Sequence, residues 1–174
     1  MDGFHPENSG LLFQGKPRFI PCNPLGFVKI LEYYKINIKS KYVVVIGRSN
    51  IVGKPITSLL PQPFKIGNAT VTLCHSHTTN LSNYTKLADI IIAAVGKPNL
   101  IKKDMVKDGC IILDIGINRI NDHSDKGYHI VGDVDFSSLV EKASYITPVP
   151  GGVGPMTISM LMHNTILAAE LSIK

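Results

Sequence analysis

Runs of β-branched and other apolar residues alternate with segments of helical periodicity, and this alternation constrains the fold more than any other feature of the chain. Tyr42–Ile46 is typical of a strand buried on both faces of a sheet. The pattern predicts strands at 42–46, 69–73, 89–95, 110–114, 129–131 and 145–146, and helices at 25–34, 52–60, 83–88, 102–106, 135–143 and 156–171. Residues 2–24 contain many breakers and are expected to be irregular. We therefore expect an α/β fold with a Rossmann-like, doubly wound and mostly parallel sheet.

Glycines and polar residues gather just after the predicted strands. Such clusters occupy positions 47–49, 74–78, 96–98 and 116–118. Ligands of parallel sheets bind at the carboxyl ends of the strands, so these clusters are the candidate site.

The segment Gly47–Gly53 follows the first strand and opens a helix, which is where a dinucleotide pyrophosphate would sit. It departs from the G-x-G-x-x-G pattern, because Ser49 replaces the second glycine and the last glycine comes one residue late. A plain strand–helix turn is the alternative interpretation.

The end of the second predicted strand favours NADP over NAD. An NAD site usually has a carboxylate there, whereas this strand is followed by His75-Ser76-His77. Arg48 and Ser76 would accept a 2′-phosphate through a guanidinium and a hydroxyl. Taken alone, Ser76 is more simply interpreted as an ordinary loop hydroxyl. The spacing of Cys74, His75 and His77 does not form a tetrahedral metal set, so no metal is expected.

The segment Ile146–Thr157 is rich in proline and glycine and leads into an apolar helical pattern. A stiff loop of this kind offers backbone N–H groups to a ligand, although a tight turn before a terminal helix would look the same. With Pro21–Pro24, Gly47–Gly53 and Gly132–Asp135, it resembles the bifunctional methylenetetrahydrofolate dehydrogenase/methenyltetrahydrofolate cyclohydrolase family. The resemblance runs in order along almost the whole chain.

The resemblance implies a role in one-carbon metabolism and purine biosynthesis. The implied reactions are NADP-dependent oxidation of 5,10-methylenetetrahydrofolate to 5,10-methenyltetrahydrofolate and hydrolysis of that product to 10-formyltetrahydrofolate. It also implies site residues, namely Gly47, Arg48, Ser49, Ser76 and Ile117 for the cofactor and Asp2, Pro150, Gly151, Gly152, Val153 and Gly154 for the folate substrate. Without the resemblance, Asp2 is a solvated terminus and Ile117 a core residue beside a turn.

Family members carry a catalytic lobe before the region matched here, with a catalytic lysine and a tyrosine four residues before it. We expect that lobe to be missing, so no catalytic residue is assigned in this chain. The expected division is 1–23 as a remnant of the lobe, 24–150 as the NADP-binding domain, and 151–174 as the folate-contacting loop with a helix returning to the lobe. For Asp133 and Asp135 a functional role is the alternative, but both are interpreted as structural, with Asp135 as a helix N-cap.

Two other functions fit the same residues. One is a non-catalytic NADP-binding fragment, or one half of a split enzyme. The other is a Rossmann dehydrogenase acting on shikimate or an amino acid, against which the Pro-Val-Pro-Gly-Gly segment argues. Because the last helix would lose its partner lobe, its apolar residues Ile158, Leu161, Ile166 and Leu167 are expected to form an exposed patch.

Composition excludes several partners. Net charge is +5, but the basic residues are scattered, so no nucleic-acid partner is expected. The apolar runs are too short to cross a membrane and the N-terminus does not resemble a signal peptide. Three widely spaced cysteines argue for reduced thiols and a cytoplasmic protein, with an organellar version sharing the same core. The expected assembly is a homodimer or a complex with a separate catalytic lobe.

Overall fold

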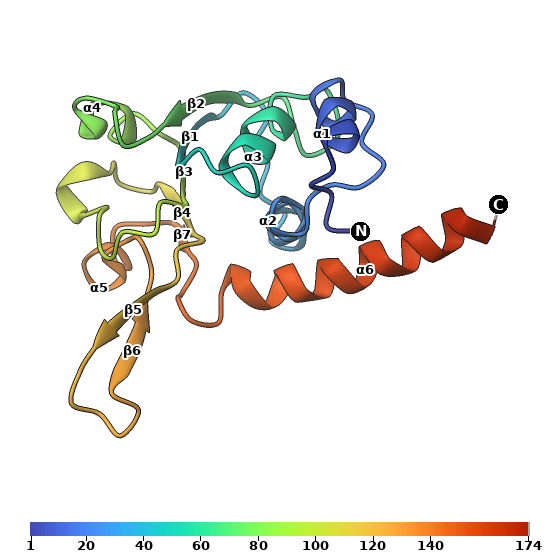
Figure 1. Cartoon of the computed structure of the whole chain (residues 1–174). Coiled ribbons are helices and arrows are strands. Elements are labelled where there is room, and N and C mark those ends of the chain that lie inside the picture. The colour runs from blue at the N-terminus through green and yellow to red at the C-terminus, as the bar shows by residue number, and fades with distance from the viewer. Residues whose placement is uncertain (174) are drawn as a thin grey trace.

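A five-stranded parallel sheet forms the centre of the computed structural model, which describes residues 1–173. The strands are β1 (Tyr42–Ile46), β2 (Thr70–Cys74), β3 (Ile90–Ala93), β4 (Ile111–Asp114) and β7 (Tyr145–Ile146). They lie in the order β2-β1-β3-β4-β7 (Figure 1). All neighbouring pairs are parallel, and the expected Rossmann-like, doubly wound α/β fold is confirmed.

Helices cover both faces of this sheet. One face carries α1 (Pro6–Phe13), α2 (Cys22–Tyr33) and α3 (Gly53–Leu59). The other carries α4 (Leu81–Thr85), the 3₁₀ turn η1 (Lys103–Met105) and α5 (Phe136–Leu139). The last helix, α6 (Val153–Ile173), packs along α2 and then extends beyond the rest of the molecule (Figure 1).

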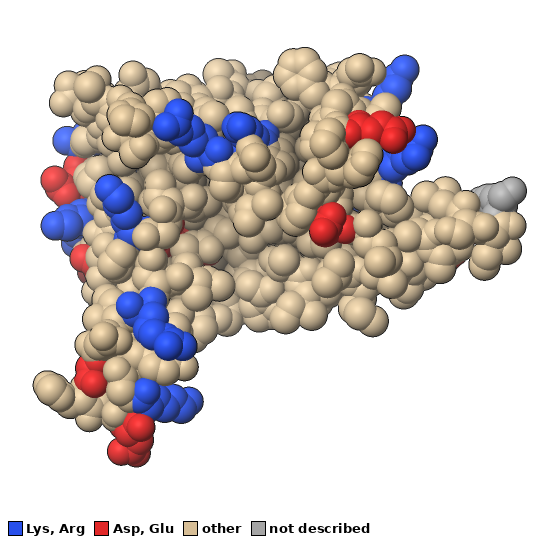
Figure 2. Space-filling model, in the orientation of Figure 1, with Lys and Arg blue, Asp and Glu red and all other residues tan. Residues whose placement is uncertain are grey.

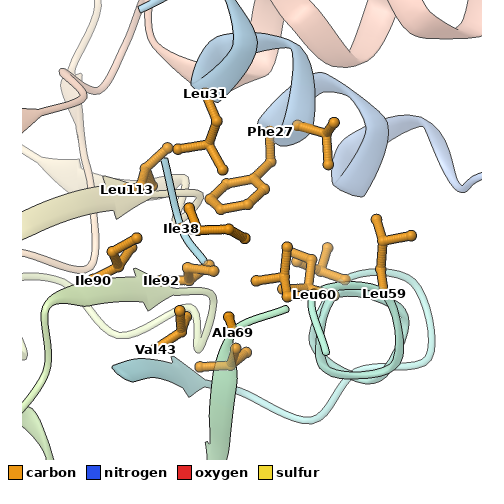
Figure 3. Packing of buried hydrophobic residues seen from close by; sticks show 14 of the residues in the cluster. Phe27, Leu31, Ile38, Val43, Leu59, Leu60, Ala69, Ile90, Ile92 and Leu113 are labelled. Carbon is orange, nitrogen blue, oxygen red and sulfur yellow. The ribbon is translucent and has the colours of Figure 1, made fainter. Parts of the chain in front are cut away.

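Strand side chains alternate between two apolar clusters, one on each face of the sheet. In β1, Val43 and Val45 join the cluster under α2 and α3, while Val44 and Ile46 join the cluster on the opposite face. Figure 3 shows the first cluster, in which Phe27 and Leu31 of α2 reach toward the sheet. Both side chains are fully buried, and burying such a side chain contributes about 1.5–3 kcal/mol.

A small antiparallel hairpin projects from the sheet after β4. It consists of β5 (Asn118–Asn121) and β6 (Tyr128–Val131) (Figure 1). The sequence predicted only its second strand. In the hairpin, the guanidinium carbon of Arg119 lies 3.8 Å from the centroid of the Tyr128 ring.

Two predicted irregular segments contain helix. Pro6–Phe13 is helical because Pro6 occupies the first turn, where it needs no N–H partner, and the His5 imidazole accepts from Glu7 N at 3.3 Å. In the proline-rich segment, α6 already begins at Val153 and tolerates Pro155 in its first turn for the same reason. Lys174, the last residue of the predicted 151–174 segment, lies outside the described residues.

Candidate functional site

The parallel strands end on a common row. Ile46 of β1 is paired with Cys74 of β2 and Ala93 of β3, and Ala93 is paired with Asp114 of β4. The turns that follow these residues therefore leave the sheet at one edge, called here the carboxyl edge. Because β2 lies on one side of β1 and β3 on the other, the order in which strands are added to the sheet reverses at β1. Doubly wound sheets bind ligands at such a switch point.

The turn after β1 has no room for side chains at two positions. Gly47 has φ of +121°, and a Cβ there would lie 2.1 Å from Ala94 O in the turn after β3. A Cβ at Gly53 would lie 1.9 Å from Gly47 O. The two turns and the start of α3 are thus in direct backbone contact at the switch point, leaving a cradle that a phosphate group could approach closely.

Ser49 explains the departure from the usual glycine pattern. Its hydroxyl accepts from Val52 N at 3.1 Å and from Gly53 N at 3.4 Å, so it caps the start of α3. Within residues 1–173, the backbone N–H groups of residues 48–51 have no protein acceptor. These N–H groups are the ones that the turn offers to an anion.

The turns after β1 and β2 lie side by side. Gly47 N donates to Cys74 O at 2.9 Å, and Arg48 and Ser76 each follow the paired residues Ile46 and Cys74 by two positions. Both side chains are exposed. The β2 turn is fixed by a hydrogen bond from His75 N to the Thr78 hydroxyl at 2.9 Å, and it contains no carboxylate.

Two buried carboxylates lie under the other half of the carboxyl edge. Asp114 ends β4 and Asp133 follows β6, and together they bind backbone N–H groups of the turns after β3 and β4. Desolvation raises the pKa of Asp114, although three backbone N–H groups oppose this effect. Ile117 follows Gly116 in the β4 turn and has 69% of its surface exposed, so it is a surface residue and not part of the core.

Asp135 has the N-cap role predicted for it. Its carboxylate accepts from Ser138 N at 3.4 Å at the start of α5. The Ser137 hydroxyl, together with that of Ser138, lowers the pKa of this exposed carboxyl group.

The five cofactor candidates belong to turns at one edge, whereas the folate candidates line different cavities. Asp2 borders a small cavity near the N-terminus, and its carboxylate accepts from Phe4 N at 3.1 Å. Gly151 and Gly152 border an apolar cavity of about 920 Å³ between α2, β4, β7 and the start of α6. Val153 is buried, and Pro150 and Gly154 line neither cavity.

Two further properties concern the described residues as a whole. Residues 1–173 contain no group of three His, Cys, Asp or Glu side chains arranged to hold a metal ion. No helix in the same range combines the length and hydropathy that crossing a bilayer requires.

Residues 21–173 match the family model described as tetrahydrofolate dehydrogenase/cyclohydrolase, NAD(P)-binding domain. Bifunctional protein FolD from Nautilia profundicola is 56% identical over 170 residues, and FolD from Halobacterium salinarum is 54% identical over 170 residues. Both alignments cover 98% of this chain and 57% of the relative, so the chain spans less than two thirds of these proteins.

Solved structures agree. The bifunctional FolD dehydrogenase/cyclohydrolase from Campylobacter jejuni superposes with a TM-score of 0.90 at 52% identity, covering 98% of this chain and 58% of that one. The Trypanosoma brucei enzyme, solved with NADP and an inhibitor, has a TM-score of 0.91 at 36% identity, covering 99% and 59%. The chain belongs to the tetrahydrofolate dehydrogenase/cyclohydrolase family and corresponds to its NAD(P)-binding domain.

Proposed function

We propose that this chain is the NADP-binding part of an enzyme of one-carbon metabolism. The enzyme oxidises 5,10-methylenetetrahydrofolate to 5,10-methenyltetrahydrofolate and hydrolyses that product to 10-formyltetrahydrofolate. Family membership supports this proposal, because the Campylobacter jejuni relative is named for both a dehydrogenase and a cyclohydrolase activity.

The proposal of NADP rather than NAD rests on the neighbouring positions of Arg48 and Ser76. Both follow the same register pair and both are exposed, so a guanidinium and a hydroxyl are available where the adenosine ribose of a dinucleotide would lie. A 2′-phosphate is favoured by charge-assisted hydrogen bonds from arginine, and no carboxylate in the β2 turn would repel it. The similar Trypanosoma brucei enzyme was solved with NADP.

The remaining residues at the carboxyl edge would orient the cofactor and exclude water. When bound, NADP supplies the hydride acceptor, and this oxidation needs no general base. Gly47 and Gly53 let the backbone approach the pyrophosphate, and free N–H groups of the β1 turn face it. Ile117 presents an apolar surface on the β4 side, three strands from the β2 turn.

The folate would contact residues outside this edge. We assign the pterin ring to Asp2, whose carboxylate can accept two N–H bonds, and the rest of the folate to Pro150–Gly154. In this proposal, residues 1–23 border a catalytic lobe, 24–150 form the NADP-binding domain and 151–174 return to that lobe.

Binding measurements on the whole chain test the cofactor assignment. In Arg48→Ala and Ser76→Ala we expect the dissociation constant for NADP to rise by about 10–100-fold for the arginine and less for the serine. The constant for NAD should change little, because NAD lacks the 2′-phosphate. Arg119→Ala, which removes an arginine from the hairpin, is the matched control and should leave both constants unchanged. Equal losses for NAD and NADP in Arg48→Ala would contradict the assignment.

A second candidate is a cofactor-binding half that turns over only with a partner. The chain spans 57% of its FolD relatives, and α6 carries an exposed apolar stripe consisting of Ile158, Met162, Ile166 and Ile173. These residues are 69%, 62%, 59% and 86% exposed and lie on one side of the helix at four- and seven-residue spacing. The face of α6 visible in Figure 2 is almost entirely free of charged residues.

We propose that this stripe is covered by a partner, either a separate catalytic lobe or a second copy of the chain. Light scattering after size exclusion distinguishes the two, since a homodimer has twice the chain mass without any added protein. Ile158→Glu with Ile166→Glu should abolish the association while leaving stability within about 0.5 kcal/mol, because both side chains are exposed. If NADPH forms from methylenetetrahydrofolate with the chain alone, the second candidate is wrong.

A further inference from the structure

Asp133 is a fully buried carboxylate that accepts hydrogen bonds from the β3 turn and from the first residue of β5. Its Oδ2 accepts from Val95 N at 2.6 Å and Gly96 N at 3.0 Å. Its Oδ1 accepts from Lys97 N at 2.9 Å and from the Asn118 side-chain amide at 2.8 Å. The ion pairs found among residues 1–173 do not include Asp133.

Asp114 holds Asp133 in place from below. Its Oδ1 accepts from Gly116 N and from Asp133 N, both at 2.9 Å, and its Oδ2 accepts from Val134 N at 3.0 Å. Desolvation raises the pKa of Asp114, so keeping this group charged costs free energy.

Two glycines make room for these carboxylates. A Cβ at Gly116 would lie 2.3 Å from Asp133 Cγ, and a Cβ at Gly132 would lie 1.7 Å from Asp114 Oδ2. Neither position can therefore carry a side chain while the carboxylate beside it stays in place.

A carboxylate buried without a cation is poor evidence for a purely stabilising role, because desolvation offsets much of what its hydrogen bonds contribute. What it provides is a defined backbone shape. Three successive N–H groups, from Val95 to Lys97, converge on one carboxylate only in a narrow range of backbone conformations, here with Gly96 at φ of +68°.

The hydrogen bonds of Asp114 and Asp133 flank one exposed residue, Ile117. Gly116 N is bound to Asp114 and the Asn118 amide to Asp133, so Ile117 is fixed on both sides although its own side chain is free. The β3 turn and the β4 turn are thereby joined into one unit beside the switch point.

We propose that Asp133, supported by Asp114, is a positioning residue that sets the nicotinamide half of the cofactor site. The inference rests on the proposed NADP function. It follows from strand order, since Arg48 and Ser76 would fix the adenosine half at β1 and β2, and the rest of a dinucleotide must then run across β3 and β4.

The test compares NADP with adenosine 2′,5′-bisphosphate, a probe that carries the 2′-phosphate but no nicotinamide. Asp133→Asn is nearly isosteric, yet its amide group would point N–H donors at N–H donors of the two turns. In titration calorimetry we expect NADP to bind at least about tenfold more weakly to this variant, with the bisphosphate probe bound within about twofold of the parent chain. Amide hydrogen exchange at 95–97 and 116–118 should accelerate.

Asp89→Asn is the matched control. Asp89 also holds a backbone N–H, that of Tyr42 at 2.8 Å, but it lies at the amino end of β3. This variant should leave both ligands and the exchange of 95–97 unchanged. If Asp133→Asn does not fold, Asn118→Ala removes one of the four hydrogen bonds without placing a donor in the cradle, and it should weaken NADP selectively by a few-fold.

The outcomes distinguish failure of the proposed NADP function from failure of the positioning role of Asp133. If the parent chain binds neither NADP nor the probe, the proposed function is wrong, and the exchange measurement alone decides whether Asp133 holds the two turns. Equal weakening of NADP and the probe by Asp133→Asn, or unchanged NADP binding despite faster exchange, would overturn the positioning role.

Discussion

Gly53→Ala should destabilise the chain even though alanine is ordinarily the better helix residue. The added Cβ would lie 1.9 Å from Gly47 O and 2.6 Å from Gly47 C, both backbone atoms that no side-chain rotation can remove. Ordinary contacts begin at 3.4 Å, so the start of α3 must move by about 1.5 Å (3.4 − 1.9) away from the β1 turn. Overpacking of this kind costs about 1–3 kcal/mol.

Gly10→Ala supplies the matched control. Gly10 lies inside α1, and a Cβ there would meet nothing within 4 Å. Its replacement should stabilise the chain by about 0.5–1 kcal/mol, the usual gain from alanine in a helix. Urea unfolding followed by circular dichroism measures both variants, and each kcal/mol also corresponds to about 2–4 °C in Tm for a chain of this size.

The opposite signs of the two changes are the essential result. Calorimetry should also show weaker NADP binding by Gly53→Ala, because the displaced helix start carries the turn with it, and unchanged binding by Gly10→Ala. If Gly53→Ala were as stable as the parent chain or more so, the close packing of α3 on the β1 turn would be refuted.

Three further predictions concern titrating groups. Cys22, Cys74 and Cys110 are buried free thiols whose pKa values are raised by burial, so a disulfide reagent at pH 8 should modify them slowly in the folded chain and all three quickly in urea. The pKa of Cys110 is raised to about 12 from 9.0, so stability should be full below pH 9 and fall as the pH rises toward 12, and Cys110→Ala should flatten that slope in alkaline unfolding curves. The Lys107 ammonium, 2.6 Å from Asp89, lowers the pKa of that carboxyl below 3.8. The ion pair between Lys107 and Asp89 should contribute about 1 kcal/mol to the free energy of unfolding above pH 4. This contribution should disappear as the pH falls through the lowered pKa of Asp89, so Asp89→Asn and the parent chain should have equal stability in strong acid.

The sequence predicted the sheet well because most of its strands are short runs of β-branched and other apolar residues. The run Tyr42–Ile46 is bounded by polar residues and glycine and became β1 without any change of limits. The hairpin strand β5 was missed because three of the four residues of Asn118–Asn121 are polar and the strand is fixed by pairing with residues around ten positions later. The helix at Pro6–Phe13 was missed because Pro6 and Gly10 were interpreted as breakers, although one lies in the first turn and the other has open space around it.

The candidate site was only partly predictable for a related reason. Arg48 and Ser76 follow predicted strands, so the expected topology places both at the carboxyl edge. That each lies two residues beyond the paired residues Ile46 and Cys74 could be known only from the strand register of the folded sheet. The Asp114–Asp133 pair joins residues 19 positions apart and depends on side-chain directions that periodicity does not contain. The sequence signals were an aspartate at the end of a β-branched strand, glycines at 116 and 132 whose missing side chains leave room for carboxylates, and the Gly132–Asp135 motif of the family resemblance.

Under the proposed function, the carboxyl edge orients the hydride acceptor, and its two buried carboxylates are already engaged by backbone N–H groups. Asp133 accepts four hydrogen bonds and Asp114 accepts three, and both side chains are buried, so neither is open to a substrate proton. His75 and His77 belong to the β2 turn, three strand spacings or about 14 Å from the β4 turn that carries Ile117. Oxidation of a methylene bridge needs only orientation, whereas hydrolysis of the methenyl product needs proton transfer. Under the proposed function, the two reactions therefore make different demands on this chain, and we expect hydrolysis, rather than oxidation, to depend on a proton-transfer residue outside the carboxyl edge.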